Sequence, residues 1–400
     1  MSWNKVPIKT ICKGIYDGPH ATPPESSSGA VFLGIPNFIN GQLDLSNIRY
    51  ISEQDLPKWT KRVTPQPNDI VFSYEATLNL YAIIPKGFWG CLGRRMALIR
   101  VDERKADYKF LYYYFYSTAW RSVIQEHTVT GATVDRIPLV SFPDFLVELP
   151  DLPTQRRIAS ILSAYDDLIE NNRRQIKLLE EAAQRLYREW FVELRFPGHE
   201  GVKVMDGVPE GWMKGTVDNI VKLLSGYPFK SSEYVSSGKY RLITIKNVKD
   251  GEFSPDNVDY IDQLPDKVPS HCILTEGDIL LSLTGNIGRV CIVNGYNYLL
   301  NQRVAKLQTL HPAYAYCMFR SKEMLNKMTA LSNGVAQQNL SLIRAEKIRI
   351  LIPSSNLLFQ FKNIVEPIIS QIILLNNQIT FACEARDRLL PELMDGEIEV

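Results

Sequence analysis

The 400-residue chain carries few residue combinations that could perform covalent chemistry. A nuclease of the PD…ExK type needs paired carboxylates and a lysine on adjoining strands. The segment FPDFLVELPD (142–151) begins in this way but has Leu-Pro where the lysine belongs. Its alternation before a proline is typical of an edge strand. We therefore expect a strand here and no nuclease centre.

Other catalytic signatures are also missing from the sequence. An adenine methyltransferase would need an NPPY-like tetrapeptide, and TPPE (22–25) lacks its polar and aromatic ends. No GKS or GKT completes a phosphate-binding loop. The five histidines and six scattered cysteines show no metal-ligand spacing and no CxxC pair. We predict no catalytic residue, no metal and no cofactor in this chain, which would bind and position rather than catalyse.

Side chains suited to nucleic-acid contacts do occur at predicted turns. Arginine pairs with guanine O6 and N7, amides pair with adenine, and lysines or hydroxyls at turns contact phosphates. The candidate DNA-binding residues are Arg94, Arg95, Thr133, Arg136, Lys230, Lys246, Lys249, Arg303, Gln337, Gln338 and Asn339. Internal salt bridges or ordinary solvated loops remain open alternatives for each of them.

Composition sets wide limits on the class of protein. With 45% hydrophobic and 22% charged residues, the chain is typical of a folded protein, and its length suits two domains. No apolar run approaches the roughly 20 residues that cross a bilayer, and the start, MSWNKVPIKT, lacks a secretion signal. A formal net charge of +1 does not by itself indicate what kind of partner the protein binds. We expect a reducing, cytoplasmic setting.

The second half of the chain repeats the first at an offset of 203 to 210 residues. In order, FLGIPNFINGQL (32–43) matches LITIKNVKDGEF (242–253), NDIVFS (68–73) matches GDILLS (277–282), RRMALIR (94–100) matches QRVAKLQ (302–308), and TGATVDRIPL (130–139) matches NGVAQQNLSL (333–342). The first pair predicts hairpins with Asn-Gly or Asp-Gly turns. A collinear series of this kind indicates a duplication.

Each half is predicted to be a mixed α/β (α+β) globular domain followed by a long helix. The stretch 108–124 is expected to be one further helix, with its counterpart at 312–331. The expected boundaries are 1–151 for the first domain, 152–195 for the central helix, 196–211 for a linker, 212–352 for the second domain and 353–400 for the terminal helix.

Both long helices carry an apolar stripe with steps of three and four residues. Helices of about 60 Å, at 1.5 Å per residue, would overhang a domain of this size, so we expect them to pair with each other, antiparallel, as a coiled coil. The pairing residues would be Ile158, Leu162, Tyr165, Ile169, Ile176, Leu179 and Leu186 with Phe361, Val365, Ile368, Ile372, Leu375, Ile379 and Leu389. Packing of each helix on its own domain is the alternative.

Two features of the first helix leave alternatives open. Asn172 interrupts the apolar stripe, where a buried asparagine would fix the register, or it is exposed. Tyr187, Trp190 and Phe191 close the helix and are either buried under the second domain or linker, or exposed as an anchor for a partner, since aromatic residues dominate binding hot spots.

The sequence resembles the specificity subunit of type I restriction-modification systems. The resemblance rests on DGPHATPP (17–24), on LPTQRRIASILSAYDDLIENNRRQIKLLEEAAQRLYREWFVELRFPG (152–198) and on its degenerate copy at 352–398, and it covers essentially the whole chain. The second copy departs from the pattern in lacking an acidic residue beside Asn376 and Asn377.

The resemblance implies two target-recognition domains separated by antiparallel helices, each reading one half of a bipartite asymmetric DNA site. It implies two modification subunits that use S-adenosylmethionine and two restriction subunits driven by ATP with Mg. A coiled-coil adaptor whose repeated domains bind proteins is the rival hypothesis. Swapping the first domain and mapping the methylated motif would separate the two.

Overall fold

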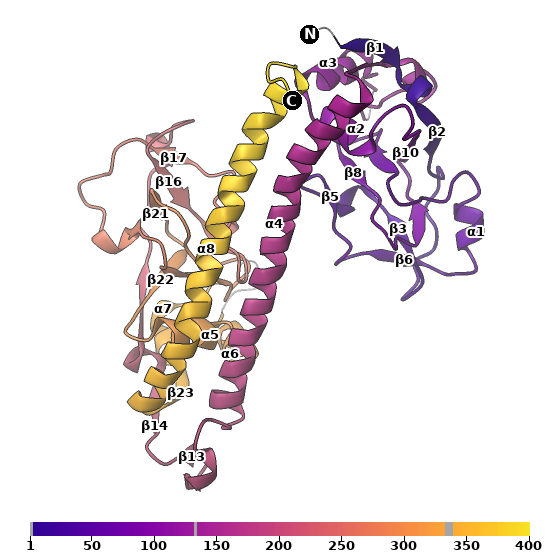
Figure 1. Ribbon diagram of the computed structural model, residues 1–400. Helices are drawn as coiled ribbons and strands as arrows, with labels where there is room; N and C mark the ends of the chain where they lie inside the picture. The colour runs from indigo at the N-terminus through magenta and orange to yellow at the C-terminus, as the bar shows by residue number, and fades with distance from the viewer. Residues whose placement is uncertain (1–2, 132–133, 333–338) are drawn as a thin grey trace. The chain divides into compact units, whose positions relative to one another are not determined.

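The computed structural model describes residues 3–131, 134–332 and 339–400, which divide into two units. One unit comprises Met1–Leu168 with Ala382–Val400, and the other comprises Ile169–Phe381. The long helices α4 (Leu152–Tyr187) and α8 (Ser355–Met394) each contribute to both units. Each unit is described below by itself (Figure 1).

The first unit is built on a four-stranded antiparallel sheet in the order β2-β10-β7-β8. A three-stranded sheet, β6-β3-β9, contains the parallel pair β3–β9, and two short antiparallel pairs, β1–β11 and β4–β5, complete the fold. The strands are β1 (Asn4–Pro7), β2 (Cys12–Asp17), β3 (Ala30–Leu33), β4 (Phe38–Ile39), β5 (Gln42–Leu43), β6 (Arg49–Ile51), β7 (Ile70–Ser73), β8 (Tyr81–Ile83), β9 (Gly90–Leu92), β10 (Met96–Val101) and β11 (Leu146–Leu149); the short helices are α1 (Leu56–Trp59), α2 (Tyr108–Tyr114) and α3 (Thr118–His127).

The second unit repeats this plan. Its sheets are β15-β22-β19-β20, β17-β16-β21-β18 with the parallel pair β16–β21, and the two-stranded β14–β23 and β12–β13. The strands are β12 (Val204–Met205), β13 (Val208–Pro209), β14 (Met213–Thr216), β15 (Val221–Ser225), β16 (Tyr240–Ile243), β17 (Tyr260–Ile261), β18 (Ile273–Leu274), β19 (Ile279–Ser282), β20 (Val290–Ile292), β21 (Tyr298–Leu300), β22 (Val304–Thr309) and β23 (Arg349–Ile352); the short helices are α5 (Pro312–Phe319), α6 (Lys322–Leu331) and α7 (Leu342–Glu346).

An equivalent set of hydrogen bonds, found within each unit, supports the duplication. Buried Asn37 accepts from the Gly34 N–H at 2.9 Å and donates to the Asp44 carbonyl at 3.1 Å. Buried Asn247, 210 residues later, accepts from Thr244 N–H at 2.9 Å and donates to the Ser254 carbonyl at 2.9 Å. An asparagine at the equivalent position therefore closes the equivalent turn before each of the two hairpins. The first hairpin turn, Asn40–Gly41, has the two positive φ values (50° and 78°) that such a turn needs.

The expectation of a single helix over 108–124 is wrong. The chain bends after Tyr114, and Ser117 begins α3 as an N-cap that accepts from the Trp120 N–H. The counterpart stretch is also divided, with Ser321 capping α6 through the Met324 N–H. A serine that satisfies an orphan N–H of the next helix favours a break over a continuous helix.

Each unit has its own principal core, and the long helices take part in both. Ile158 and Leu162 of α4 and Leu393 of α8 are buried in the core of the first unit. In the second unit Tyr187 of α4 and Phe361 of α8 lie with their ring centroids 6.4 Å apart. The start of α4 thus shares a core with the end of α8, and the end of α4 with the start of α8, which confirms antiparallel pairing.

The helix α8 is also long and apolar enough, by length and composition alone, to cross a membrane. One 18-residue window has a mean hydropathy of 1.3, and 28% of it is buried. Buried residues of α8 include Val365, Ile372 and Leu375 of the predicted pairing stripe. Exposed apolar residues of α8 include Leu374 and Phe381, which are 50% and 63% exposed.

Candidate nucleic-acid interface

One corner of the first four-stranded sheet brings separate segments together. The strands β2 and β7 end here and β10 begins here. The Gly18 N–H donates to the Met96 carbonyl at 2.8 Å, and the Tyr74 N–H donates to the Arg95 carbonyl at 3.1 Å. A side chain on Gly18 would have its Cβ 2.5 Å from the Gly93 carbonyl oxygen, so only glycine lets the two loops approach this closely.

Arg95 and Arg303 occupy the same place in the two units and share a rare backbone conformation. Their φ angles are 74° and 77°, in the left-handed region that costs a non-glycine residue about 1–2 kcal/mol. The Arg303 carbonyl accepts from the Leu283 N–H at 2.9 Å, as the Arg95 carbonyl accepts from the Tyr74 N–H. Strain that recurs at one place in both copies points to a functional site.

The arginine side chains at this place differ in exposure. Arg94 and Arg303 are exposed, whereas Arg95 is half-buried, with its Nε 3.7 Å from a carboxylate oxygen of Glu75. Arg94 and Arg303 are therefore free to contact a ligand through their guanidinium groups. The position of the Arg95 side chain near Glu75 agrees in part with the alternative interpretation, an internal ion pair.

The loops predicted to carry base-reading residues reach the same corner. Arg136 forms a β-bridge with Glu75, and Asn339 forms the equivalent bridge with Thr284 in the second unit. Both Arg136 and Asn339 are exposed. Three further candidates, Thr133, Gln337 and Gln338, lie outside the described residues. Arg136 and Arg95 thus pair with the adjacent residues Glu75 and Tyr74, and Asn339 and Arg303 pair with the adjacent residues Thr284 and Leu283.

The lysine candidates are less uniform. Lys230 precedes the turn Ser231–Glu233 and is exposed, as is Lys246. Lys249 is also exposed, but its Nζ lies 2.6 Å from Glu252. None of the three has a hydrogen bond with Arg303 in the described part of the chain.

Sequence reasoning missed three residues at the first corner. The Asp17 carboxylate, at the end of β2, accepts from His20 Nε2 at 2.8 Å and forms an ion pair with Arg62 Nη1. Their side chains are 61% exposed for His20 and 49% for Arg62. The sequence signal was the motif beginning Asp-Gly-Pro-His, which was used only for the family resemblance; Arg62 gave no signal of its own.

The buried Tyr74 shows that these charges belong to the same corner as the predicted arginines. Desolvation raises the pKa of its hydroxyl, the negative charges of Asp17 and Glu75 raise it further, and the positive charges of Arg62 and Arg94 oppose this. Groups from four segments of the chain therefore act on one hydroxyl.

The equivalent corner of the second unit carries different side chains. The Gly226 N–H donates to the Val304 carbonyl at 3.0 Å, as Gly18 does in the first unit, but Ser225 stands where the first unit has Asp17. Buried Asn301 donates to the Tyr234 hydroxyl at 3.4 Å. Two copies of one scaffold thus present different chemistry.

The predicted pairing residues of the long helices are all buried or half-buried. Fully buried members are Ile158, Leu162, Ile169, Phe361, Val365, Ile372 and Leu375; half-buried members are Tyr165, Ile176, Leu179, Leu186, Ile368, Ile379 and Leu389. Of the two alternatives for Asn172, burial is observed: it is 2% exposed, and its Nδ2 donates to Gln378 Oε1 at 3.1 Å.

In each unit a carboxylate of α4 forms a hydrogen bond and an ion pair with neighbouring helices. In the first unit, Asp166 of α4 accepts from Tyr113 of α2 at 2.5 Å and lies 2.6 Å from Arg386 of α8. In the second, Glu180 of α4 binds Tyr316 and Arg320 of α5 and its C-cap. Burial raises the pKa of the Glu180 carboxyl, although the positive charge of Arg320 opposes the shift.

The aromatic residues that close α4 lie in the core of the second unit. Tyr187, Trp190 and Phe191 are between 6% and 8% exposed, and the rings of Trp190 and Phe191 pack on Phe361 at 5.8 and 4.9 Å. They therefore present no exposed anchor for a partner. The alternative of burial is the one that the packing favours.

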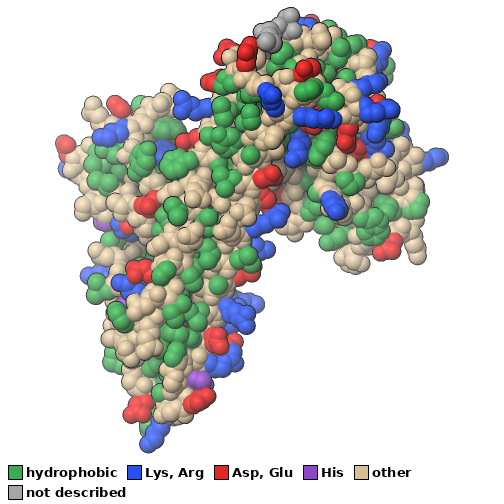
Figure 2. All heavy atoms as spheres, viewed as in Figure 1, with side chains coloured by type: hydrophobic (Ala, Val, Ile, Leu, Met, Phe, Trp, Pro, Cys, Tyr) green, Lys and Arg blue, Asp and Glu red, His purple; other side chains and the backbone are tan. Residues whose placement is uncertain are grey.

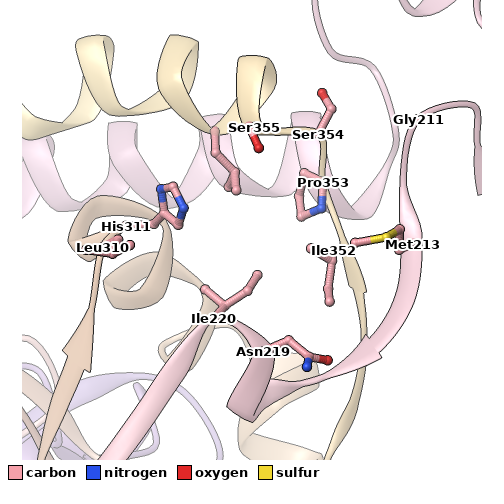
Figure 3. Close-up of a pocket in the computed structure, with 11 residues that line it drawn as sticks. Gly211, Met213, Asn219, Ile220, Leu310, His311, Ile352, Pro353, Ser354 and Ser355 are labelled. Atoms are coloured by element: carbon pink, nitrogen blue, oxygen red, sulfur yellow. The ribbon is translucent and has the colours of Figure 1, made fainter.

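A cavity of about 350 Å³ lies at the start of α8, lined by Ile220, His311 and Ser355 among others (Figure 3). The equivalent place in the first unit is occupied by Gln155, which accepts from the Asp107 N–H at 2.9 Å and donates to the Pro150 carbonyl at 2.8 Å. The repeat has Leu358 in this position. Leu358 is buried and contributes to the lining of the cavity, so the two units differ in polarity at this place.

Comparison with known proteins agrees with this architecture. The chain matches the family described as the type I restriction modification DNA specificity domain over residues 3–181 and again over 209–380. The chain belongs to this family. The double match agrees with the duplication, and membership favours a specificity subunit over the rival protein-binding adaptor.

Individual relatives support the assignment. The chain is 26% identical over 378 residues to the MjaIX specificity subunit of Methanocaldococcus jannaschii, which covers 89% of this chain and 85% of the relative. It is 22% identical over 332 residues to the HindI specificity subunit of Haemophilus influenzae, covering 67% and 72%. A crystal structure of the type I S subunit from M. genitalium has the same fold, with a TM-score of 0.56 at 16% identity and coverage of 98% and 96%.

This protein is a DNA specificity subunit of a type I restriction-modification system, a non-catalytic component of that enzyme.

Proposed function

We propose that each globular domain reads one half of a bipartite, asymmetric DNA target. The observation that carries this proposal is the repeated corner, where the same backbone holds Arg95 in one copy and Arg303 in the other while the surrounding side chains differ. Two copies of one backbone scaffold that carry different side chains suit the recognition of two different half-sites. The helices α4 and α8, which contribute to both units, would set the spacing between them.

Within this proposal the arginines and the loop residues have distinct tasks. Arg94, Arg95 and Arg136 would serve the first half-site, and Arg303 and Asn339 the second, with Thr133, Gln337 and Gln338 completing the loops. Arginine suits guanine, and amides suit adenine. The exposed Lys230 and Lys246 suit phosphates, whereas Lys249 would first have to leave Glu252.

A domain exchange tests the proposal. We expect that replacing residues 1–151 with those of a related subunit changes one half of the methylated sequence in the host genome and leaves the other half unchanged. Binding should weaken steeply with salt, because phosphate contacts release counterions. An unchanged motif after the exchange would contradict the proposal.

We also propose that modification subunits dock on the exposed apolar face of the long helices. Figure 2 shows hydrophobic side chains along α8, and Phe359, Leu374 and Phe381 are 60%, 50% and 63% exposed. Apolar surface of this kind typically marks a protein contact. The partners would be two modification subunits that use S-adenosylmethionine and two restriction subunits that use ATP and Mg, in the cytoplasm where the DNA is.

Charged substitutions on this face test the docking. We expect Leu374→Glu and Phe381→Glu to reduce co-purification with the modification subunit, because a carboxylate cannot enter an apolar interface without a large desolvation cost. Thr380→Glu, an exposed position on the adjoining face of α8, is the matched control. Equal recovery of the partner with all three variants would rule out this docking surface.

A further inference from the structure

The cluster of Asp17, His20 and Arg62 is a feature of the first corner that the duplication does not explain. One carboxylate holds two side chains, His20 from the loop after β2 and Arg62 from the loop after α1. Arg62 Nη1 also approaches the Gly18 carbonyl at 3.5 Å. The Asp17–Arg62 pair is thus fixed to the loop at Gly18. This loop can lie against Gly93 only because residue 18 has no side chain.

The geometry leaves the outer edges of both the Arg62 guanidinium and the His20 ring free. Among the residues that the structure describes, Arg62 makes no hydrogen bond beyond those of Nη1, so its Nε and Nη2 donors remain available. His20 uses only Nε2 in the same described set. An arginine already held by a carboxylate loses less conformational entropy when it binds, which is the advantage of preorganisation.

The negative charge of Asp17 decides between two kinds of DNA contact. A carboxylate behind the guanidinium repels a phosphate but has much less effect on the neutral acceptors of a guanine edge. Guanine N7 and O6 are also the acceptors that the paired donors of arginine fit. The second unit has Ser225 in place of Asp17, as expected if the two copies read different bases.

We propose that Arg62, positioned by Asp17, reads a guanine in the first half-site, with His20 held on the same carboxylate. This inference rests on the proposed function, in which the first domain reads one half of the target. It assigns a specificity-determining role to Arg62 and a positioning role to Asp17.

The test uses the subunit co-produced with its modification subunits, with methylated adenines mapped in the host genome. We expect Arg62→Gln and Arg62→Lys to relax the motif at one G·C pair of the first half-site, with discrimination falling about tenfold or more. Lysine fails because it lacks the planar pair of donors. Asp17→Asn should relax the same base pair to a smaller extent.

The control is Lys61→Gln, an exposed neighbour of Arg62. It should leave the motif unchanged. If a variant abolishes methylation, anisotropy measurements with oligonucleotides substituted at single positions replace the genomic readout. Loss of discrimination at one first-half pair supports the proposal. A uniform loss of affinity, as for a phosphate contact, or no change at all overturns it.

The outcome is distinguishable from failure of the proposed function. If exchanging residues 1–151 changes half of the motif but Arg62→Gln changes no base preference, only the role of Arg62 is lost. If the exchange itself leaves the motif unchanged, the assignment of the first domain to a half-site is lost.

Discussion

Asn172 of α4 donates a hydrogen bond from Nδ2 to Gln378 Oε1 of α8 at 3.1 Å. Asn172 is 2% exposed, whereas Gln378 is exposed. The bond thus places one polar group inside the apolar stripe of the second unit. A polar residue at such a position selects one register, because every other register leaves its amide unpaired.

Asn172→Asp should destabilise the second unit by about 2–3 kcal/mol, because it buries a carboxylate facing an amide oxygen. The measurement is urea unfolding at pH 8. Asn171→Asp, at the exposed neighbouring position, is the control and should change stability by less than about 0.5 kcal/mol. Equal effects at the two positions would contradict a buried register contact.

Arg320→Met should destabilise the second unit by about 3–5 kcal/mol at pH 8, since it leaves the Glu180 carboxylate buried without its cation. The raised pKa of Glu180 gives the sign of the pH dependence. A raised carboxyl pKa contributes stability that is present below the unfolded pKa and lost as pH rises through the folded pKa. The deficit of the variant should therefore shrink between pH 8 and pH 5.

The control for that experiment is Arg174→Met. Arg174 pairs with Glu170 on the surface of α4, with 75% of its side chain exposed. Such a pair contributes about 0.3–0.5 kcal/mol, so this variant should show a small deficit that does not depend on pH. A deficit of Arg320→Met that stays constant with pH would contradict the role assigned to Glu180.

His311 predicts an acid sensitivity of the second unit. Burial at the cavity lowers its pKa below 6.5, and the positive charge of Lys362 lowers it further. A depressed histidine pKa contributes stability that is present above the unfolded pKa and lost as pH falls through the folded pKa. The difference in melting temperature between the wild type and His311→Asn should therefore shift in favour of the variant from pH 8 to pH 5. A constant difference would exclude this histidine as the source.

Gly18→Ala should impair recognition of the first half-site, and Gly226→Ala that of the second. In each case the added Cβ would overlap a carbonyl oxygen, of Gly93 or of Asn301, and push the corner loops apart. Overpacking of this kind costs about 1–3 kcal/mol. Oligonucleotides altered in one half-site at a time measure the effect, with Gly201→Ala, which has open space around it, as the control.

The repeat and the antiparallel helices could be predicted because apolar periodicity and collinear motifs are local signals. The alignment of Arg95 with Arg303 was also visible, but their left-handed backbone was not, since arginine rarely adopts it. Arg62 was missed because its pairing with Asp17 joins segments 45 residues apart. The break before α3 was missed because the capping role of Ser117 was outweighed by the aromatic run that precedes it.

The first unit includes the last residues of the chain, with Leu393 and Met394 only 1% and 3% exposed in its core. During synthesis the N-terminal domain therefore leaves the ribosome with part of its core missing. That gap is filled only after the entire second domain has been translated. A chain truncated before Leu393 would therefore lose core packing in the first domain, at the opposite end of the sequence, and proteolysis should begin there.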